Sequence, residues 1–162
     1  MRCSWLRLTV VVMVSILLAA CHPRGGDDDE DSPTAPSSQQ AVPQATYAFS
    51  RLCTPKQAGV DVTITEADGD IGMTVTSVVI EMIDHLDMPQ VYKTLSGPEI
   101  ATQWGGSNRL AAGETRVVSY VSAYPGNVET DDSTANVTVA ITDDAGNAST
   151  LEQKNIAQID KC

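Results

Sequence analysis

Two pairs of aspartates are the residues of this chain whose type and spacing best suit chemistry. Asp68 and Asp70 flank a glycine, and Asp143 and Asp144 precede Ala-Gly-Asn. Paired carboxylates act as acid and base in glycoside hydrolysis, and clustered carboxylates bind calcium. Neither stretch matches the twelve-residue calcium loop, and turns favour Asp on local grounds. We therefore expect no metal or other cofactor, and these four aspartates are the candidate ligands if calcium binds.

Catalysis by an activated nucleophile has little support from the sequence. His85 is the only histidine beyond position 22, and it lies in the polar stretch Asp84-His85-Leu86-Asp87. A nucleophilic serine or cysteine needs an adjacent base, and a zinc site needs three or four ligands. No serine lies in a nucleophile motif and His85 has no histidine partner in this part of the chain. We predict a solvated turn histidine and a protein without enzymatic activity.

The chain begins with a segment that predicts an export signal rather than part of a fold. Arg2 and Arg7 precede an apolar stretch over residues 8–18, which two alanines follow. A basic start, an apolar stretch of about 7–15 residues and a small-residue end are typical of a secretory signal peptide. A membrane-spanning helix needs about 20 apolar residues. We therefore expect residues 1–20 to be removed.

The end of this segment, Leu18-Ala19-Ala20-Cys21, resembles the lipobox of bacterial lipoproteins. The resemblance implies cleavage before Cys21, acylation of that cysteine, and attachment to a membrane through lipid. Two or more acyl chains hold a protein stably on a bilayer. In that family an Asp after the cysteine marks retention at the inner membrane, and His22 stands there instead. We therefore expect the outer membrane of a bacterial envelope, with the rest of the chain on its periplasmic or surface face.

Residues 21–45 read as the lipidated cysteine followed by a disordered acidic tether. Residues 22–45 contain four prolines, the five consecutive acids 27–31 and no aromatic residue. Such a stretch buries too little apolar surface to offset its ordering entropy, and its like charges keep it extended. We interpret it as a spacer. A signal for export to the cell surface, carried by the acidic run, is the alternative.

The four cysteines of the chain can be assigned different roles from their positions. If Cys3 leaves with the signal and Cys21 carries lipid, Cys53 and Cys162 remain, in a compartment that permits disulfides. We expect a disulfide between them, which would join the end of the first strand to the last residue. Closing a loop of about 100 residues stabilises a protein by up to about 4.7 kcal/mol in the entropy model. Two free thiols, one of them a nucleophile or metal ligand, are the alternative.

Residues 46–162 carry the pattern of a single all-β domain. Turn residues recur every eight to twelve positions between short β-branched runs. Apolar and polar residues alternate in 60–65 and 136–142, and the alternation slips near Thr76 within 73–83, which predicts a bulge. Seven runs together predict an immunoglobulin-like sandwich, the remaining four being 47–52, 90–95, 115–124 and 149–156.

One segment departs from the β pattern. Residues 98–104 predict a short helix that Ser96 or Gly97 caps and Gly105 ends. A proline and a glutamate suit its first turn. Trp104 is the only tryptophan beyond position 5, and we expect it to plug one end of the sandwich, since a large ring stabilises most when buried.

The segment 137–147, Val-Thr-Val-Ala-Ile-Thr-Asp-Asp-Ala-Gly-Asn, resembles the closing hairpin of bacterial immunoglobulin-like and fibronectin-type modules. The resemblance covers this hairpin and implies the same sandwich fold for the domain. The tryptophan that marks antibody-type domains on their third strand is absent, so the resemblance does not extend to that group.

Length and charge exclude several classes of protein. A chain of 162 residues without internal repeats holds one domain, and a net charge of −11 argues against nucleic acid. We expect a monomeric, membrane-anchored lipoprotein that presents an interaction or structural module to an envelope protein or glycan. The alternative is a periplasmic or surface hydrolase, or a subunit of one, that acts on glycans.

Overall fold

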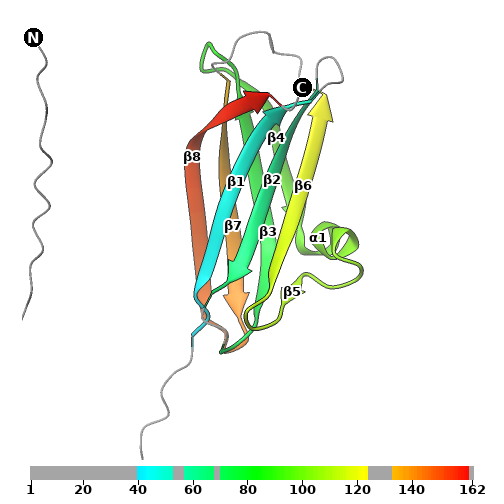
Figure 1. The fold of residues 1–162 in the computed structure, drawn as a ribbon, viewed down its shortest axis with the longest axis vertical. Coiled ribbons are helices and arrows are strands. Elements are labelled where there is room, and N and C mark those ends of the chain that lie inside the picture. Colours follow the sequence, from blue (N-terminus) through cyan, green and yellow to red (C-terminus); the bar gives the residue numbers. More distant parts are fainter. Residues whose placement is uncertain (1–39, 53–56, 68–69, 124–132, 161–162) are drawn as a thin grey trace, which may run out of the picture. The chain divides into compact units, whose positions relative to one another are not determined.

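The computed structural model describes residues 40–52, 57–67, 70–123 and 133–160, which all lie in the compact unit Ser37–Cys162. These residues form strands and one short helix, so the predicted all-β class is confirmed (Figure 1). The elements are β1 (Pro43–Arg51), β2 (Gln57–Glu66), β3 (Met73–Ile83), β4 (Pro89–Ser96), α1 (Gly97–Gln103), β5 (Arg109–Leu110), β6 (Thr115–Ala123), β7 (Thr134–Asp143) and β8 (Ala148–Asp160).

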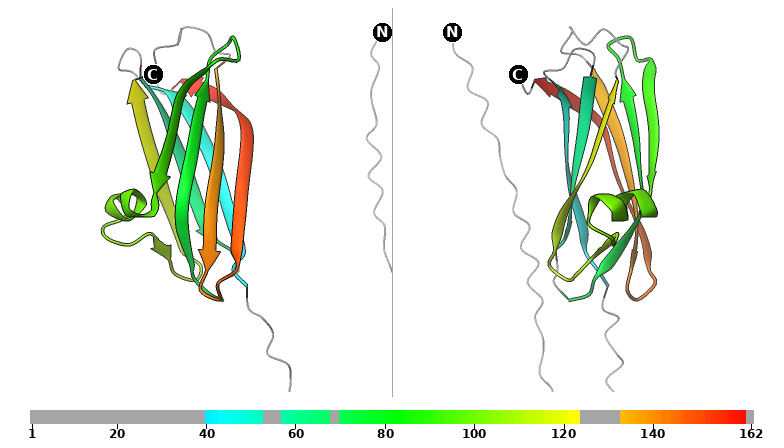
Figure 2. Two further views of the ribbon diagram at one scale, coloured as in Figure 1. Left: turned by 180° about the vertical axis from the view of Figure 1, so that it is seen from behind. Right: turned by 90° about the vertical axis from the view of Figure 1, so that its right-hand side faces the viewer.

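The strands form one nearly closed, barrel-like sheet with the order β4-β3-β7-β8-β1-β2-β6, and β5 pairs with the start of β3. One layer contains β1, β2 and β6, and the other contains β3, β4, β5 and β7. Strand β8 belongs to both, because it pairs antiparallel with β7 and then, at residues 158–160, parallel with β1. The right-hand view of Figure 2 shows the two layers edge on.

The first strand begins earlier than the predicted start of the domain at residue 46. In β1, Pro43 lies opposite Glu66 and Gln44 opposite Thr65, so the antiparallel ladder with β2 continues to the end of that strand. Residues 43–45 belong to β1 because β2 extends far enough to pair with them. The sequence of residues 43–45 by itself does not reveal this partner.

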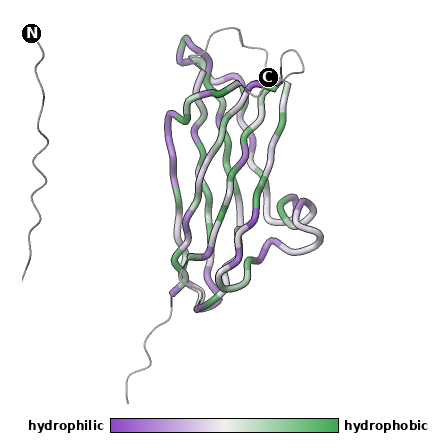
Figure 3. Tube along the Cα trace, viewed as in Figure 1, coloured by the Kyte–Doolittle hydropathy of each residue, from purple (hydrophilic) through white to green (hydrophobic). Residues whose placement is uncertain are grey.

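The core lies between the two layers and follows the predicted alternation. Along the strands, hydrophobic residues alternate with hydrophilic ones (Figure 3). The fully buried side chains that line the inner faces include Val60, Val62 and Ile64 from β2, Val75, Val78, Ile80 and Met82 from β3, and Val137 and Val139 from β7. Phe49, the only phenylalanine of the chain, is also fully buried.

Two irregularities bend the sheet. The register of β3 against β7 shifts between Val75 and Ser77, which confirms the bulge predicted near Thr76. A second shift lies in the pairing of β7 with β8, between Ala135 and Val137, where residues 154 and 155 of β8 lie opposite Asn136 alone. Beside it Asn155 has φ of 54°, a left-handed conformation that Asn tolerates better than most residues.

Helix α1 starts one residue before the predicted span and ends where the sequence indicates. The Glu99 carboxylate accepts hydrogen bonds from the Ser96 backbone N–H and hydroxyl, both at 2.8 Å, and the Lys93 ammonium at 2.6 Å. These contacts, the Lys93 bond first, lower the pKa of Glu99 from 4.5 to about 2. Gly105, with φ of 82°, ends the helix in the conformation that glycine adopts most readily.

Trp104 lies at the edge of β6 rather than at an end of the barrel, which corrects the prediction. Its Nε1 donates to the Val117 carbonyl at 2.7 Å, and the Arg116 guanidinium lies over its ring, 5.5 Å from the centroid. Gln103 Oε1 accepts the backbone N–H of Ser119 at 2.9 Å. Because this edge of β6 has no neighbouring strand in the sheet order, side chains from α1 take the place of a strand there. The indole needs this polar partner, which an apolar end would not supply.

Candidate functional site

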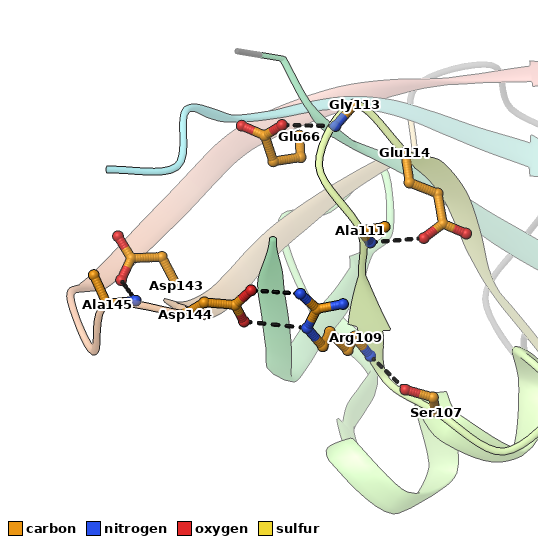
Figure 4. A network of polar contacts seen from close by, with 9 residues as sticks. All are labelled: Glu66, Ser107, Arg109, Ala111, Gly113, Glu114, Asp143, Asp144 and Ala145. Atoms are coloured by element: carbon orange, nitrogen blue, oxygen red, sulfur yellow. Dashed lines mark hydrogen bonds and ion pairs between the residues drawn. The ribbon is translucent and has the colours of Figure 1, made fainter. Parts of the chain in front are cut away.

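The aspartates of the closing hairpin serve the turn itself. Asp143 Oδ1 accepts the backbone N–H groups of Ala145 and Asn147 at 3.0 and 2.7 Å. Its Oδ2 accepts the Asn147 side-chain amide at 2.9 Å and the Ala41 backbone N–H at 3.4 Å. The Asn147 amide, with the backbone bonds, lowers the pKa of Asp143. Both carboxylate oxygens are therefore occupied by donors from the protein, and Figure 4 shows the bond from Ala145.

Asp144 is paired with a cation. Arg109 Nε donates to Asp144 Oδ1 at 3.1 Å, and Arg109 Nη2 donates to Oδ2 (Figure 4). This bidentate contact holds the pKa of Asp144 below its ordinary value of 3.8. The pair joins the β7–β8 turn to β5.

Glu66 completes this cluster and is a residue that the sequence gives no reason to select. It is 1% exposed, and its carboxylate accepts the backbone N–H of Val42 at 3.3 Å and that of Gly113 at 2.8 Å. Nearby, the Glu114 carboxylate accepts the Ala111 backbone N–H at 2.8 Å. We call the four acids Glu66, Glu114, Asp143 and Asp144 the end network. It binds the segment through which the chain enters β1.

Of the other predicted site residues, only one lies among the residues that the structure describes. Asp70 lies in a bend before β3, whereas Asp68, Cys21, Cys53 and Cys162 lie outside the described residues. Lipid attachment at Cys21 and the disulfide therefore stay predictions. Within residues 40–52, 57–67, 70–123 and 133–160, no group of three or more His, Cys, Asp or Glu side chains is arranged to hold a metal ion.

His85 is exposed in the turn between β3 and β4, as predicted. Asp84 shapes this turn, because its Oδ1 accepts the backbone N–H groups of Leu86 and Met88, both at 2.9 Å. The Met88 bond, with its companions, lowers the pKa of Asp84. The carboxylate beside His85 is thus engaged in holding the hairpin.

A hollow of about 360 Å³ lies on the outer face of the layer that contains β3, β4, β7 and β8. Its wall consists of Tyr92 from β4, Glu81 and Val79 from β3, and Asn136 and Thr138 from β7. Glu152 and Lys154 of β8 complete it. The hollow is at the small end of the range for ligand sites.

Strand register explains why these residues meet. Tyr92 lies opposite Glu81, and Glu81 lies opposite Asn136, so the three form one row across the strands. Val79, Thr138 and Glu152 form the next row in the same way. Residues two apart on a strand share a face, and the intervening residues point into the core.

Asn136, one of the residues that line the hollow, is held by two hydrogen bonds. Its Nδ2 donates to Glu81 Oε2 at 2.9 Å, and its Oδ1 accepts the Asn155 backbone N–H at 3.0 Å. The second contact lies at the register shift between β7 and β8, so one amide bonds both this irregular part of β8 and Glu81. Bulges of this kind re-aim side chains beside functional sites.

The rim of the hollow carries an exposed ring and an ion pair. Tyr92 is 71% exposed, the largest value among the exposed large hydrophobic side chains of the described residues. Lys154 Nζ lies 3.0 Å from Glu152 Oε1 in an exposed pair. Rigid strands present an aromatic face, an amide, a hydroxyl and both signs of charge around one concave surface. Such a surface suits binding by contact and hydrogen bonding.

Sequence reasoning did not select any residue of this hollow. The polar faces of 73–83 and 136–142 are visible in the alternation, and Tyr92 lies in the predicted run 90–95. A lone aromatic residue on the polar side of a strand is the one signal that points to Tyr92. The pairing that brings Tyr92, Glu81 and Asn136 together depends on register between distant segments.

No family model and no curated protein matches the chain. Similar solved structures include the structural genomics target SoR45, at 8% identity and a TM-score of 0.47, which covers 70% of this chain and 84% of that chain. The putative ApaA protein from Bordetella pertussis is 18% identical with a TM-score of 0.44 over 73% and 89% of the two chains. ACE19, the collagen binding subdomain of the Enterococcus faecalis surface protein ACE, is 11% identical with a TM-score of 0.34 over 76% and 100%. At these TM-scores the likenesses carry no argument about family or function.

No helix within the described parts of the chain has the length and apolar character needed to cross a membrane.

Proposed function

We propose that this protein is a lipid-anchored, non-enzymatic binding module of the bacterial cell envelope. The observation that carries the proposal is the hollow on the outer face of β3, β4, β7 and β8, where an exposed ring and polar groups share one rigid concave surface. The lipobox-like Leu18-Ala19-Ala20-Cys21 supplies the anchor and the acidic stretch that follows supplies the spacer. The outer membrane is the proposed location, and the domain acts as a monomer.

The domain itself is proposed to be a variant of the immunoglobulin-like sandwich. The chain crosses between layers from β2 to β3, from β5 to β6 and from β6 to β7, and β8 pairs first with β7 and then with β1. A core packed between two layers of short antiparallel strands is common to such sandwiches. In this variant, the change of layer by β8 joins the two sheets into one.

The absence of enzymatic activity is supported by what the acids do. A glycan hydrolase would need free acids that converge on a cleft, as paired carboxylates do around a scissile bond. Asp143 and Asp144 instead bind backbone amides and Arg109, and Asp84 binds the turn that holds His85. These residues therefore have structural partners that compete with substrate or calcium.

The anchor is tested by fractionation of cells that produce the full chain. The wild-type protein is expected in the membrane fraction, and Cys21→Ala is expected in the soluble fraction, because the acyl chains have no other attachment point in the proposal. Cys3→Ala is the matched control, since Cys3 lies in the predicted signal and should leave fractionation unchanged. Membrane association of Cys21→Ala equal to that of the wild type would contradict the anchor.

The binding face is tested by site-specific photo-crosslinking in intact cells. A benzophenone side chain replaces Thr94, which lies opposite Val79 on the outer face of β4, or Thr46, an exposed threonine on β1 in the other layer. Adducts of higher mass are expected from position 94 and not from position 46. Equal adduct formation at both positions, or none at either, would overturn the proposed face.

A further inference from the structure

The hollow has unused hydrogen-bonding capacity around a fixed frame. The side-chain amide nitrogen of Asn136 has two N–H donors, and one of them donates to Glu81. The Thr138 hydroxyl can donate and accept, and the Glu81 carboxylate has acceptor sites beyond the one that Asn136 occupies. A ligand with both donors and acceptors, spaced within a few ångströms, would satisfy these groups.

The charges of the hollow disfavour an ionic ligand. Its wall carries two carboxylates, Glu81 and Glu152, and one ammonium, Lys154, so a phosphate or another anion would meet an excess of negative charge. A cation would compete with partners already in place, because Lys154 lies 3.0 Å from Glu152 and Asn136 donates to Glu81. The arrangement is best matched by a neutral, polar molecule.

Tyr92 adds a flat apolar surface at the rim. Its side chain is 71% exposed and lies opposite Glu81 in the register, so the ring and the carboxylate are neighbours on one face. A sugar ring has one face of C–H groups, which packs on an aromatic ring, and hydroxyls around its edge that both donate and accept. These two features correspond to Tyr92 and to the row of polar groups beside it.

We propose that this hollow binds a neutral saccharide, with one sugar ring on the face of Tyr92 and its hydroxyls bonded to Glu81, Asn136 and Thr138. The inference rests on the proposed function, since it names the class of partner that the same face recognises. The strands set the geometry before the ligand arrives, which limits the ordering entropy that binding costs.

The test uses the full, lipidated chain in phospholipid nanodiscs and saturation-transfer NMR on the free sugars. Cellobiose, maltose and N,N′-diacetylchitobiose are the saccharide probes, and pentalysine and inorganic phosphate represent the ionic classes. Binding of at least one disaccharide is expected. Tyr92→Ala should weaken it about tenfold or more, whereas Tyr92→Phe, which keeps the ring, should retain most of it. Val121→Ala, an exposed residue on β6, is the matched control and should change nothing.

Each outcome decides the inference separately from the proposed function. Circular dichroism of the Tyr92 variants confirms that a loss of binding is not a loss of fold. The saccharide proposal is overturned if none of the three sugars binds, if Tyr92→Ala binds as well as the wild type, or if pentalysine or phosphate binds in their place. Protein adducts from position 94 in the crosslinking experiment would then leave the binding face standing, and no adducts at all would remove both.

Discussion

The end network and the hollow both contain carboxylates on a β scaffold, yet they use them in opposite ways. In the end network, Asp143 accepts four hydrogen bonds and Asp144 is paired through both oxygens with Arg109. In the hollow, Glu81 accepts one hydrogen bond from Asn136, and Tyr92 stands exposed beside it. The polar groups of the end network are occupied in holding the chain, whereas some of the polar groups of the hollow can still bond a ligand.

The difference shows why residue type alone is a poor guide to function. In the sequence, the Asp pairs suggest acid–base catalysis or calcium binding. Turns and strand ends, however, need acceptors for their backbone N–H groups, and Asp supplies such acceptors locally. The end network also binds Ala41 and Val42, which the sequence assigned to the tether and which lead directly into β1. We interpret it as the attachment point that keeps the domain folded where the tether joins it.

Acid is expected to have the largest effect, because it removes several contacts of the end network together. Hydrogen bonds from Asn147, from Arg109 and from a backbone N–H lower the pKa of Asp143, Asp144 and Glu114, respectively. A carboxylate with a lowered pKa in the folded state stabilises the fold above its ordinary value, here 3.8 or 4.5, and loses that contribution as the pH falls through the lowered pKa. The melting temperature should therefore fall steadily below about pH 4.5.

Thermal unfolding followed by circular dichroism from about pH 7 to about pH 2.5 measures this loss. Asp143→Asn, which cannot titrate, should melt at a lower temperature than the wild type at neutral pH and should lose less on acidification. A melting temperature that stays level or rises on going to low pH would show that these carboxylates do not hold the fold.

Glu66→Ala is expected to lower the free energy of unfolding by about 2 kcal/mol, because it removes a buried carboxylate and leaves the part-buried N–H groups of Val42 and Gly113 without that acceptor. Glu66→Gln keeps one acceptor oxygen and should cost less. Glu152→Ala is the matched control in the hollow region, where an exposed glutamate should change stability by about 0.5 kcal/mol or less. Urea denaturation measures all three, and equal effects of Glu66→Ala and Glu152→Ala would contradict the division between the two regions.

The sequence predicts most of the fold because strands have a recognisable local pattern of alternating apolar and polar residues. The alternation of Val60, Val62 and Ile64 indicates one buried face, and these side chains are fully buried in the structure. The bulge near Thr76 was predicted from a slip of the same pattern. The two-residue β5 carries no such pattern, and the parallel pairing of β8 with β1 joins segments at opposite ends of the domain.

The candidate site could not be predicted in the same way. Tyr92, Glu81 and Asn136 become neighbours only when β4, β3 and β7 pair in one register, and register is a property of the whole sheet. The position of Trp104 was predicted wrongly for a related reason, since the unpaired edge of β6 that it covers exists only once the strand order is known.

Asn136→Ala should lower the free energy of unfolding by about 1.5 kcal/mol, since two hydrogen bonds of a half-buried amide are lost and the bend of β8 is released. Saccharide binding should weaken as well, because Glu81 loses the partner that positions it. Asn155→Gly is the control: glycine adopts a φ of 54° without strain, so stability should stay nearly constant. If Asn155→Gly destabilised the protein as much as Asn136→Ala, the backbone of β8 rather than the amide of Asn136 would determine the bend.

Tyr92→Ala is expected to have the smallest effect on stability, about 0.5 kcal/mol or less, because most of the side chain is already in water. Phe49→Ala is the matched aromatic control, and its fully buried ring should cost about 3–5 kcal/mol. A residue kept for binding should show this combination of little effect on unfolding and a large effect on ligand. If urea denaturation gave more than about 1 kcal/mol for Tyr92→Ala, the ring would be part of the packing of β4, and the contrast between a region that holds the chain and a region that binds would fail at its central residue.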